Sequence, residues 1–156
     1  MKTLLACVCV SAILAAPLAH AQDAAVEAPI HQFIDGVGKG DMASVKAAHV
    51  ASPVIIDNVA PHIWSGPNAF DTFLTALVAS ESASGKSDAA LAIGPVITET
   101  INGDNAYVVV PSTYTFKQKG QTLRETGTMT FVLDKQTSGW KIASWTWTSP
   151  DAQPVP

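Results

Sequence analysis

Residues 106–134 read AYVVVPSTYTFKQKGQTLRETGTMTFVLD and carry the clearest structural signal in the 156-residue chain. Two long runs in which apolar and polar residues alternate flank Lys119-Gly120, a dipeptide typical of a two-residue β-hairpin turn. Such a turn pairs Tyr114 with Glu125 across the two strands. One face of the hairpin is then mostly apolar and the other is rich in threonine. This pattern predicts an antiparallel sheet that is covered on one side only.

Helices are predicted on the amino-terminal side of this hairpin, where apolar residues recur at helical spacing. Asp41 is a suitable N-cap for one of them, and Pro67 suits the first position of another. The expected helices cover residues 28–37, 41–48 and 67–80, and a polar loop is expected at 81–88. The expected strands cover residues 54–64, 89–101, 106–118, 121–134 and 140–148. We therefore expect an α+β fold with three helices packed on a strongly curved, mostly antiparallel sheet.

The first residues form a segment that is not expected to belong to the fold. An uncharged apolar run at residues 4–19 follows Lys2, and Ala-His-Ala at 19–21 fits a signal-peptidase site. We expect a signal peptide at 1–21, a domain at 22–148 and a flexible tail at 149–156. The protein is then exported, to the periplasm or the outside, and has no membrane segment after cleavage. Both cysteines leave with the signal peptide.

Composition excludes several classes of protein. Hydrophobic residues make up 47% of the chain and charged residues 14%, which excludes bulk disorder. The formal net charge is −4 and the nine Lys and Arg residues are scattered, so no nucleic-acid partner is expected. The mature histidines, His31, His49 and His62, lack the spacing of a metal site. We expect no metal and no cofactor.

The order of elements resembles the NTF2-like superfamily, which includes SnoaL-like domains and ketosteroid isomerase. The residues that carry the resemblance are Gly40-Asp41, Val54-Ile55-Ile56-Asp57, Trp64-Ser65-Gly66 and Gly139-Trp140-Lys141-Ile142. The resemblance implies a cone-shaped domain with a pocket in its opening, and often a homodimer formed through the outer face of the sheet. Such folds host isomerases, dehydratases, cyclases and binding modules, so the fold alone does not choose a function.

Asp57 is the leading catalytic candidate. It follows three apolar residues, and the resemblance places it on the general-base aspartate of the isomerase. A carboxylate in an apolar pocket has a raised pKa, which suits proton abstraction. The alternative is a strand-end aspartate that caps the turn at Asn58. Tyr114 is the candidate acid or electrophile, and His62 is a weaker candidate that could approach Asp57.

The pocket itself is expected to be largely apolar and aromatic. Its predicted residues are Phe33, Trp64, Glu125, Met129, Trp145 and Trp147. Ordinary core or dimer packing is the alternative for the tryptophans. Trp140 and Ile142 are expected on the opposite face, at a dimer contact. The resemblance to the isomerase places its two oxyanion donors at Phe33 and Met129. Neither can donate a hydrogen bond, so efficient steroid isomerisation is not expected.

Three hypotheses on function remain open at this point. The first is an exported module that binds a small apolar or aromatic molecule in its cone, without catalysis. The second is a lyase or isomerase in which Asp57 abstracts a proton. The third is a dimeric structural module whose cone is filled by its own side chains.

Overall fold

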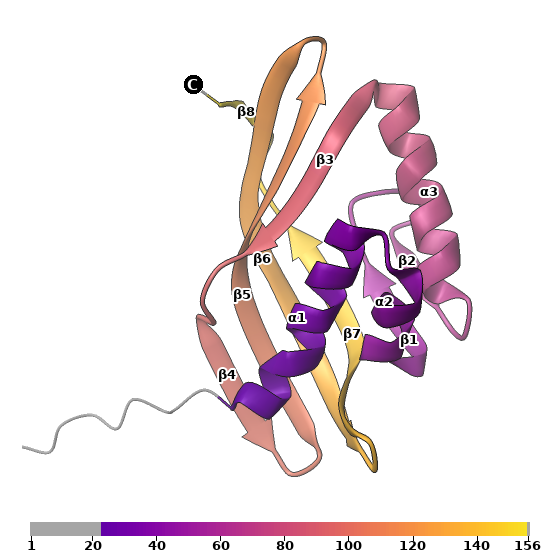
Figure 1. Cartoon of the computed structure of the whole chain (residues 1–156), viewed down its shortest axis with the longest axis vertical. Coiled ribbons are helices and arrows are strands. Elements are labelled where there is room, and N and C mark those ends of the chain that lie inside the picture. Colours follow the sequence, from indigo (N-terminus) through magenta and orange to yellow (C-terminus); the bar gives the residue numbers. More distant parts are fainter. Residues whose placement is uncertain (1–22, 156) are drawn as a thin grey trace, which may run out of the picture.

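The computed structural model describes residues 23–155, in which three helices cover one side of a curved sheet (Figure 1). The helices are α1 (Ala24–Lys39), α2 (Met42–Ala48) and α3 (Ala69–Ser84). The strands are β1 (His49–Ile56), β2 (Ile63–Ser65), β3 (Lys86–Ile93), β4 (Thr98–Asn102), β5 (Asn105–Gln118), β6 (Gln121–Gln136), β7 (Gly139–Thr148) and β8 (Gln153–Pro154). The predicted signal peptide lies outside the described residues. No helix in the described part is long and apolar enough to cross a membrane.

The eight strands form one mixed sheet in the order β2-β1-β7-β6-β5-β3, with β4 also paired to β5 and β8 to β6. Within residues 23–155, only β1 and β7 run parallel, and every other pair is antiparallel. The predicted α+β class, with three helices on a curved and mostly antiparallel sheet, is therefore confirmed. The long β5–β6 hairpin lies between β7 and β3 in this sheet, and β3 runs between the hairpin and α3 (Figure 1).

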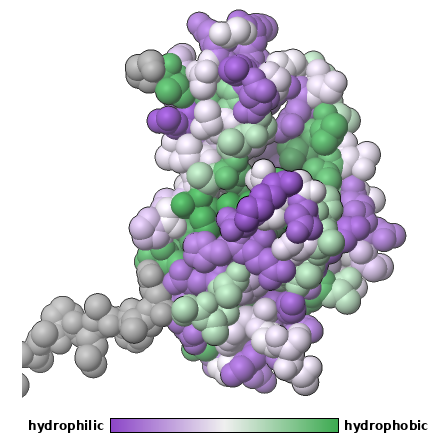
Figure 2. Space-filling view, in the orientation of Figure 1, coloured by the Kyte–Doolittle hydropathy of each residue, from purple (hydrophilic) through white to green (hydrophobic). Residues whose placement is uncertain are grey.

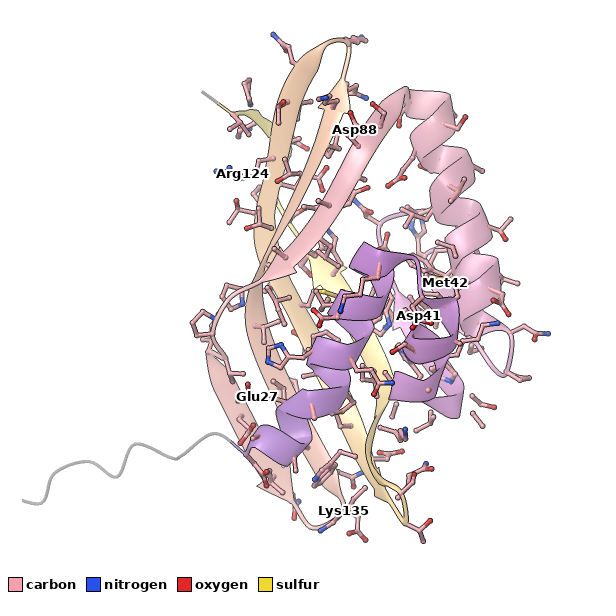
Figure 3. The ribbon with its side chains drawn as sticks, viewed as in Figure 1. Glu27, Asp41, Met42, Asp88, Arg124 and Lys135 are labelled. Carbon is pink, nitrogen blue, oxygen red and sulfur yellow. The ribbon has the colours of Figure 1, made fainter. Side chains whose placement is uncertain are left out.

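The predicted register of the β5–β6 hairpin is also confirmed. Gln118 pairs with Gln121, and Tyr114 pairs with Glu125. The apolar face of the hairpin turns toward the helices and supplies much of the core. Its buried apolar members are Ala106, Val108, Val110, Phe116, Met129, Phe131 and Leu133. Arg124 projects from the opposite side of the hairpin, away from the helices (Figure 3).

α1 begins at Ala24, earlier than predicted, because Asp23 caps it. The Asp23 carboxylate accepts a hydrogen bond of 2.9 Å from the Ala25 amide, which satisfies one of the free donors of the first turn. Pro29 therefore lies inside the helix. Gly40 ends the helix in the left-handed conformation, with φ of 69°.

The prediction of a polar loop at residues 81–88 is wrong. α3 continues to Ser84, ends at Gly85 with φ of 70°, and is followed at once by β3. The Ser84 hydroxyl donates to the Ser80 carbonyl one turn earlier, so this serine-rich stretch is compatible with a helix although it lacks an apolar stripe. This extension brings Glu81 onto a helix face.

The predicted strand at 89–101 is divided into β3 and β4, and the predicted strand at 54–64 into β1 and β2. Gly94 lies at the first break, where a Cβ would be 2.8 Å from the Pro111 ring and where its amide donates to the Pro111 carbonyl. β1 starts at His49, before Pro53, and ends at Ile56. The break after Ile56 forms a turn that starts at Asp57.

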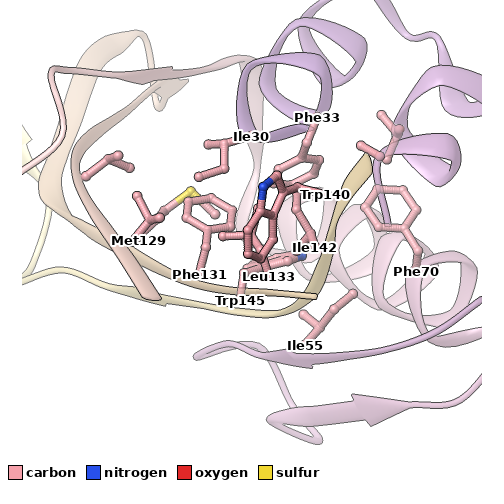
Figure 4. Packing of buried hydrophobic residues seen from close by; sticks show 14 of the residues in the cluster. Ile30, Phe33, Ile55, Phe70, Met129, Phe131, Leu133, Trp140, Ile142 and Trp145 are labelled. Atoms are coloured by element: carbon pink, nitrogen blue, oxygen red, sulfur yellow. The ribbon is translucent and has the colours of Figure 1, made fainter. Parts of the chain in front are cut away.

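Trp140 and Ile142 were predicted on the outer face of the sheet, but they lie in the core. Their exposed fractions are 9% and 0%. The reason is a β-bulge in β7: Leu133 pairs with Ile142 but the preceding Val132 pairs with Ser144, so Ala143 is an extra residue. The bulge reverses the alternation and places Ile142 and Trp145 in the same buried cluster (Figure 4).

The chain end lies against the hairpin. Gln153 and Pro154 pair with Arg124 and Leu123 of β6, so part of the predicted tail belongs to the sheet. The chain reaches this place by crossing β6 at Gly127. A Cβ on Gly127 would lie only 2.0 Å from the Thr148 carbonyl oxygen.

Candidate functional site

A cavity of about 440 Å³ lies between α1, α3 and the inner face of the sheet. Apolar and aromatic side chains supply most of its wall, and hydrophobic residues reach the surface beside α3 in Figure 2. The cavity also contains a few polar groups, contributed by the end of β1, the end of α3, the start of β3 and the β5–β6 hairpin. The ionisable residues in its wall are Asp57, Glu81, Lys86, Tyr114 and Glu125.

Asp57 is placed in the cavity wall by the end of β1. Its Oδ1 atom accepts a hydrogen bond of 2.9 Å from the Val59 amide, so it also caps the turn, as the alternative reading required. Burial raises the pKa of this carboxyl, and the negative charge of Glu125 adds to the increase. The backbone amides of Val59 and Asn58 and the nearby His62 act in the opposite direction, without reversing the shift.

Tyr114 and Glu81 form a hydrogen-bonded pair across the cavity, in which the Tyr114 hydroxyl donates to Glu81 Oε1. Burial is the main cause that raises the pKa of Tyr114, followed by this hydrogen bond and by the negative charges of Glu81, Glu125 and Asp57. Tyr114 therefore stays protonated, and its hydroxyl is already engaged in the hydrogen bond to Glu81. A ligand that uses Tyr114 as a donor must compete with Glu81.

Glu125 and Lys86 form the second polar pair. Lys86 Nζ lies 3.4 Å from Glu125 Oε1, and the Ser149 hydroxyl donates to Glu125 Oε2 over 3.3 Å. The Lys86 ammonium also lies 4.1 Å from the centre of the Phe116 ring, which is a cation–π contact. The positive charge of Lys86 is thus already engaged by an anion and an aromatic face.

Sequence reasoning missed Glu81 and Lys86. Both lie in the segment predicted as a loop, and they line the cavity because α3 and β3 extend through that segment. A signal was available in the spacing of Leu74, Leu77 and Glu81, which places all three on one face of a continuous helix. All three line the cavity.

Most of the predicted pocket residues do line the cavity. Phe33, Met129, Trp145 and Trp147 are in its wall together with Glu125. The Trp145 indole also packs on Phe33, with ring centres 5.5 Å apart. Its Nε1 atom is buried and has no hydrogen-bond partner among the described residues.

Trp64 and His62 do not line the cavity. Trp64 lies on β2 and packs edge-on against Phe73, a residue of the cavity wall, with ring centres 5.0 Å apart. His62 is exposed, and its Nδ1 atom lies 3.3 Å from the backbone oxygen of Asp57 and not from the carboxylate. The structure therefore shows no carboxylate–imidazole pair at Asp57.

The other two described histidines lie apart from the cavity. His31 is on the α1 surface beside Glu27, at 3.6 Å. His49 is buried, and its Nδ1 atom is 2.8 Å from the Val45 carbonyl oxygen; burial lowers its pKa. Within residues 23–155, no group of three or more His, Cys, Asp or Glu side chains could hold a metal ion.

The profile of the SnoaL-like domain family matches residues 26–151. The comparison with curated proteins gives no significant match. The comparison with solved structures gives many similar folds at low sequence identity.

Three of these structures illustrate the likeness. A hexachlorocyclohexane dehydrochlorinase, LinA-type3, from Novosphingobium barchaimii LL02 has a TM-score of 0.71 and 12% identity, over 85% of this chain and 88% of that one. An NTF2-like superfamily protein from Salmonella enterica has a TM-score of 0.64 and 19% identity, over 81% and 89%. A ketosteroid isomerase-like protein from Erwinia carotovora has a TM-score of 0.60 and 20% identity, over 82% and 95%. At these identities the likeness shows the fold alone.

Proposed function

Because the chain belongs to the SnoaL-like domain family of the NTF2-like superfamily, we propose that it binds a small, largely apolar molecule in the cavity beside α3. The observation that carries this proposal is the cavity itself. Its volume of about 440 Å³ lies in the range of roughly 300–1,000 Å³ that is typical of small-molecule sites. Apolar walls with a few convergent polar groups are also typical of such sites.

A blocked cavity tests this proposal. Leu77→Trp places a bulky ring in the cavity wall, and Leu123→Trp makes the same change at a half-buried leucine outside the wall. Calorimetric titration with 2-naphthalenemethanol should detect binding to the wild type and to Leu123→Trp, and little or none to Leu77→Trp. Absence of binding to the wild type, or equal binding to all three proteins, would refute the proposal. Circular dichroism checks that each variant is folded.

Catalysis is a second candidate function, favoured by the environment of Asp57. This carboxyl lines the cavity, and its raised pKa suits a general base in a lyase or isomerase. The dehydrochlorinase among the similar structures is compatible with such chemistry. Phe33 and Met129 offer no hydrogen-bond donor, and Tyr114 already donates to Glu81, so stabilisation of an enolate would be weak.

Replacing Asp57, the candidate base, tests the catalytic hypothesis. Asp57→Asn preserves an oxygen that can accept from the Val59 amide. If the protein turns over hexachlorocyclohexane or a ketosteroid, this variant should lose turnover and still bind the molecule. An unchanged rate would exclude Asp57 as the base. The third hypothesis, a structural module with a filled cone, is disfavoured by the volume of the cavity.

Export and dimerisation belong to the same proposal. The apolar run at residues 4–19 and the Ala-His-Ala site support export, and the mature protein should start at Gln22. The outer face of the sheet pairs Tyr107 with Val132, and both are well exposed, which supports a homodimer through this face. Native mass spectrometry of protein from an exporting host measures both properties. A mass that retains residues 1–21, or a monomer at all concentrations, would contradict them.

A further inference from the structure

The charged groups of the cavity are unevenly balanced. Asp57, Glu81 and Glu125 supply three carboxylates to its wall, whereas Lys86 is the one Lys or Arg among the described lining residues. The Lys86 ammonium lies beside Glu125, at 3.4 Å. Asp57 and Glu81 therefore have no Lys or Arg partner within residues 23–155.

The hydrogen bonds of these two carboxylates come from neutral donors. Asp57 accepts from the Val59 amide, and Glu81 accepts from the Tyr114 hydroxyl. Neutral donors stabilise a carboxylate without removing its negative charge. All three carboxylates line the same cavity, and the negative charge of each raises the pKa of Tyr114. That space is consequently negative in the absence of a ligand.

The rest of the wall suits an organic cation. Trp145, Trp147 and Phe33 contribute aromatic rings, and an ammonium group over such a ring is attracted by its π-electrons. Leu74 and Leu77 of α3 add aliphatic contacts for an apolar body. An anionic ligand would meet two uncompensated carboxylates, and like charges placed together weaken binding.

We infer that the molecule bound in this cavity is an amine, with a protonated ammonium group near Asp57 and Glu81 and an aromatic or alicyclic body against the tryptophan and leucine wall. This inference rests on the proposed function, because it specifies the ligand of the same cavity. It assigns Asp57 and Glu81 a role in selecting ligands by charge. Lys86 then serves to neutralise Glu125 and does not recruit an anion.

Three probes with one ring system and different charges test the inference. They are 2-naphthylmethylamine, which is a cation at neutral pH, 2-naphthalenemethanol, which is neutral, and 2-naphthoate, which is an anion. Titration calorimetry at low ionic strength should show the amine binding about tenfold more tightly than the alcohol, as one partly desolvated cation contact would give. The naphthoate should bind more weakly than the alcohol. Added salt should reduce the preference for the amine.

Variants show which carboxylates cause the preference. The readout is the ratio of the dissociation constants of alcohol and amine, so a general loss of affinity cancels. Asp57→Asn and Glu81→Gln should each lower this ratio, and the double variant should bring it close to one. Asp35→Asn is the matched control, because Asp35 is an exposed carboxylate on α1 that pairs with Lys39. It should keep the wild-type ratio.

Each outcome distinguishes the inference from the function on which it rests. If no probe binds to the folded wild type, the proposed function fails and the inference fails with it. If the alcohol binds but the amine binds no more tightly, the inference is overturned and the proposed function stands. The inference is also overturned if naphthoate binds best, or if the double variant keeps the wild-type ratio. Glu125→Gln should improve naphthoate binding, because it leaves Lys86 without its anion.

Discussion

Gly127→Ala should destabilise the protein strongly. Gly127 lies on β6 where the chain leaving β7 crosses over it. A Cβ at this position would be 2.0 Å from the Thr148 carbonyl oxygen and 2.9 Å from the Ser149 Cα atom. Both contacts are with backbone, so rotation of a side chain cannot relieve them. Thr148 is also held by its pairing with Thr128, next to the glycine.

The expected cost follows from this geometry. Inserting a methyl group into a well-packed site costs about 1–3 kcal/mol, and a clash with fixed backbone belongs at the upper end, about 3 kcal/mol. For a domain of this size, that loss lowers the melting temperature by roughly 10 °C. The displaced chain would also separate the Ser149 hydroxyl from Glu125, which changes the polar end of the cavity.

Gly38→Ala provides the matched control. Gly38 lies inside α1, and no atom lies within 4 Å of its added Cβ. This variant should be stabilised by about 0.5–1 kcal/mol, because alanine favours a helix more than glycine does. Urea unfolding followed by tryptophan fluorescence measures both variants.

A double-mutant cycle identifies the origin of the loss. Deleting residues 150–156 frees the chain after Ser149, so Gly127→Ala should cost less in the truncated protein than in the full chain. The reasoning would be refuted if Gly127→Ala lies within about 0.5 kcal/mol of the wild type, the range of ordinary surface changes.

Three further variants probe the buried polar groups. Burial raises the pKa of Asp57, so its contribution to stability is present at low pH and is lost as the pH rises through that pKa. The free energy of unfolding of Asp57→Asn, relative to that of the wild type, should therefore be higher at pH 7 than at pH 4. An equal difference at both pH values in urea unfolding would contradict this. Burial lowers the pKa of His49, so its contribution to stability is present above pH 6.5 and is lost as the pH falls. The free energy of unfolding of His49→Phe, relative to that of the wild type, should then increase from pH 7 to pH 5. A constant difference would count against a neutral buried imidazole. Tyr114→Phe removes a hydrogen bond to a carboxylate and should cost about 1.5–3 kcal/mol in thermal unfolding, and a loss below about 0.5 kcal/mol would show that solvent replaces the phenol.

Local sequence signals predicted the architecture well. The β5–β6 register depends on the turn at Lys119 and Gly120 and on strict alternation, both of which can be read from neighbouring residues. The same alternation failed in β7, because one bulge residue reverses the faces and no local pattern announces it. Trp140 was assigned to the outer face for that reason, although it is in the core.

The candidate site was predictable only in part. Asp57 could be named from its strand pattern and the family resemblance, and Tyr114 from the strand pattern alone; both line the cavity. Glu81 and Lys86 were missed, because the serine-rich end of α3 has no apolar stripe and only the spacing of Glu81 from Leu74 and Leu77 indicates that the helix continues. Trp64 was expected in the pocket, and only packing against Phe73 showed that it belongs to the core.

Composition, periodicity and turn chemistry were therefore enough to assign the fold class, the order of helices and strands, and the central hairpin register. These properties depend on residues close together in the chain. The charge balance of the cavity depends instead on contacts between distant segments, such as Tyr114 with Glu81 and Lys86 with Glu125. A long-range contact is set by how whole elements pack, so only the tertiary structure could decide which carboxylates are neutralised and which remain available to a ligand.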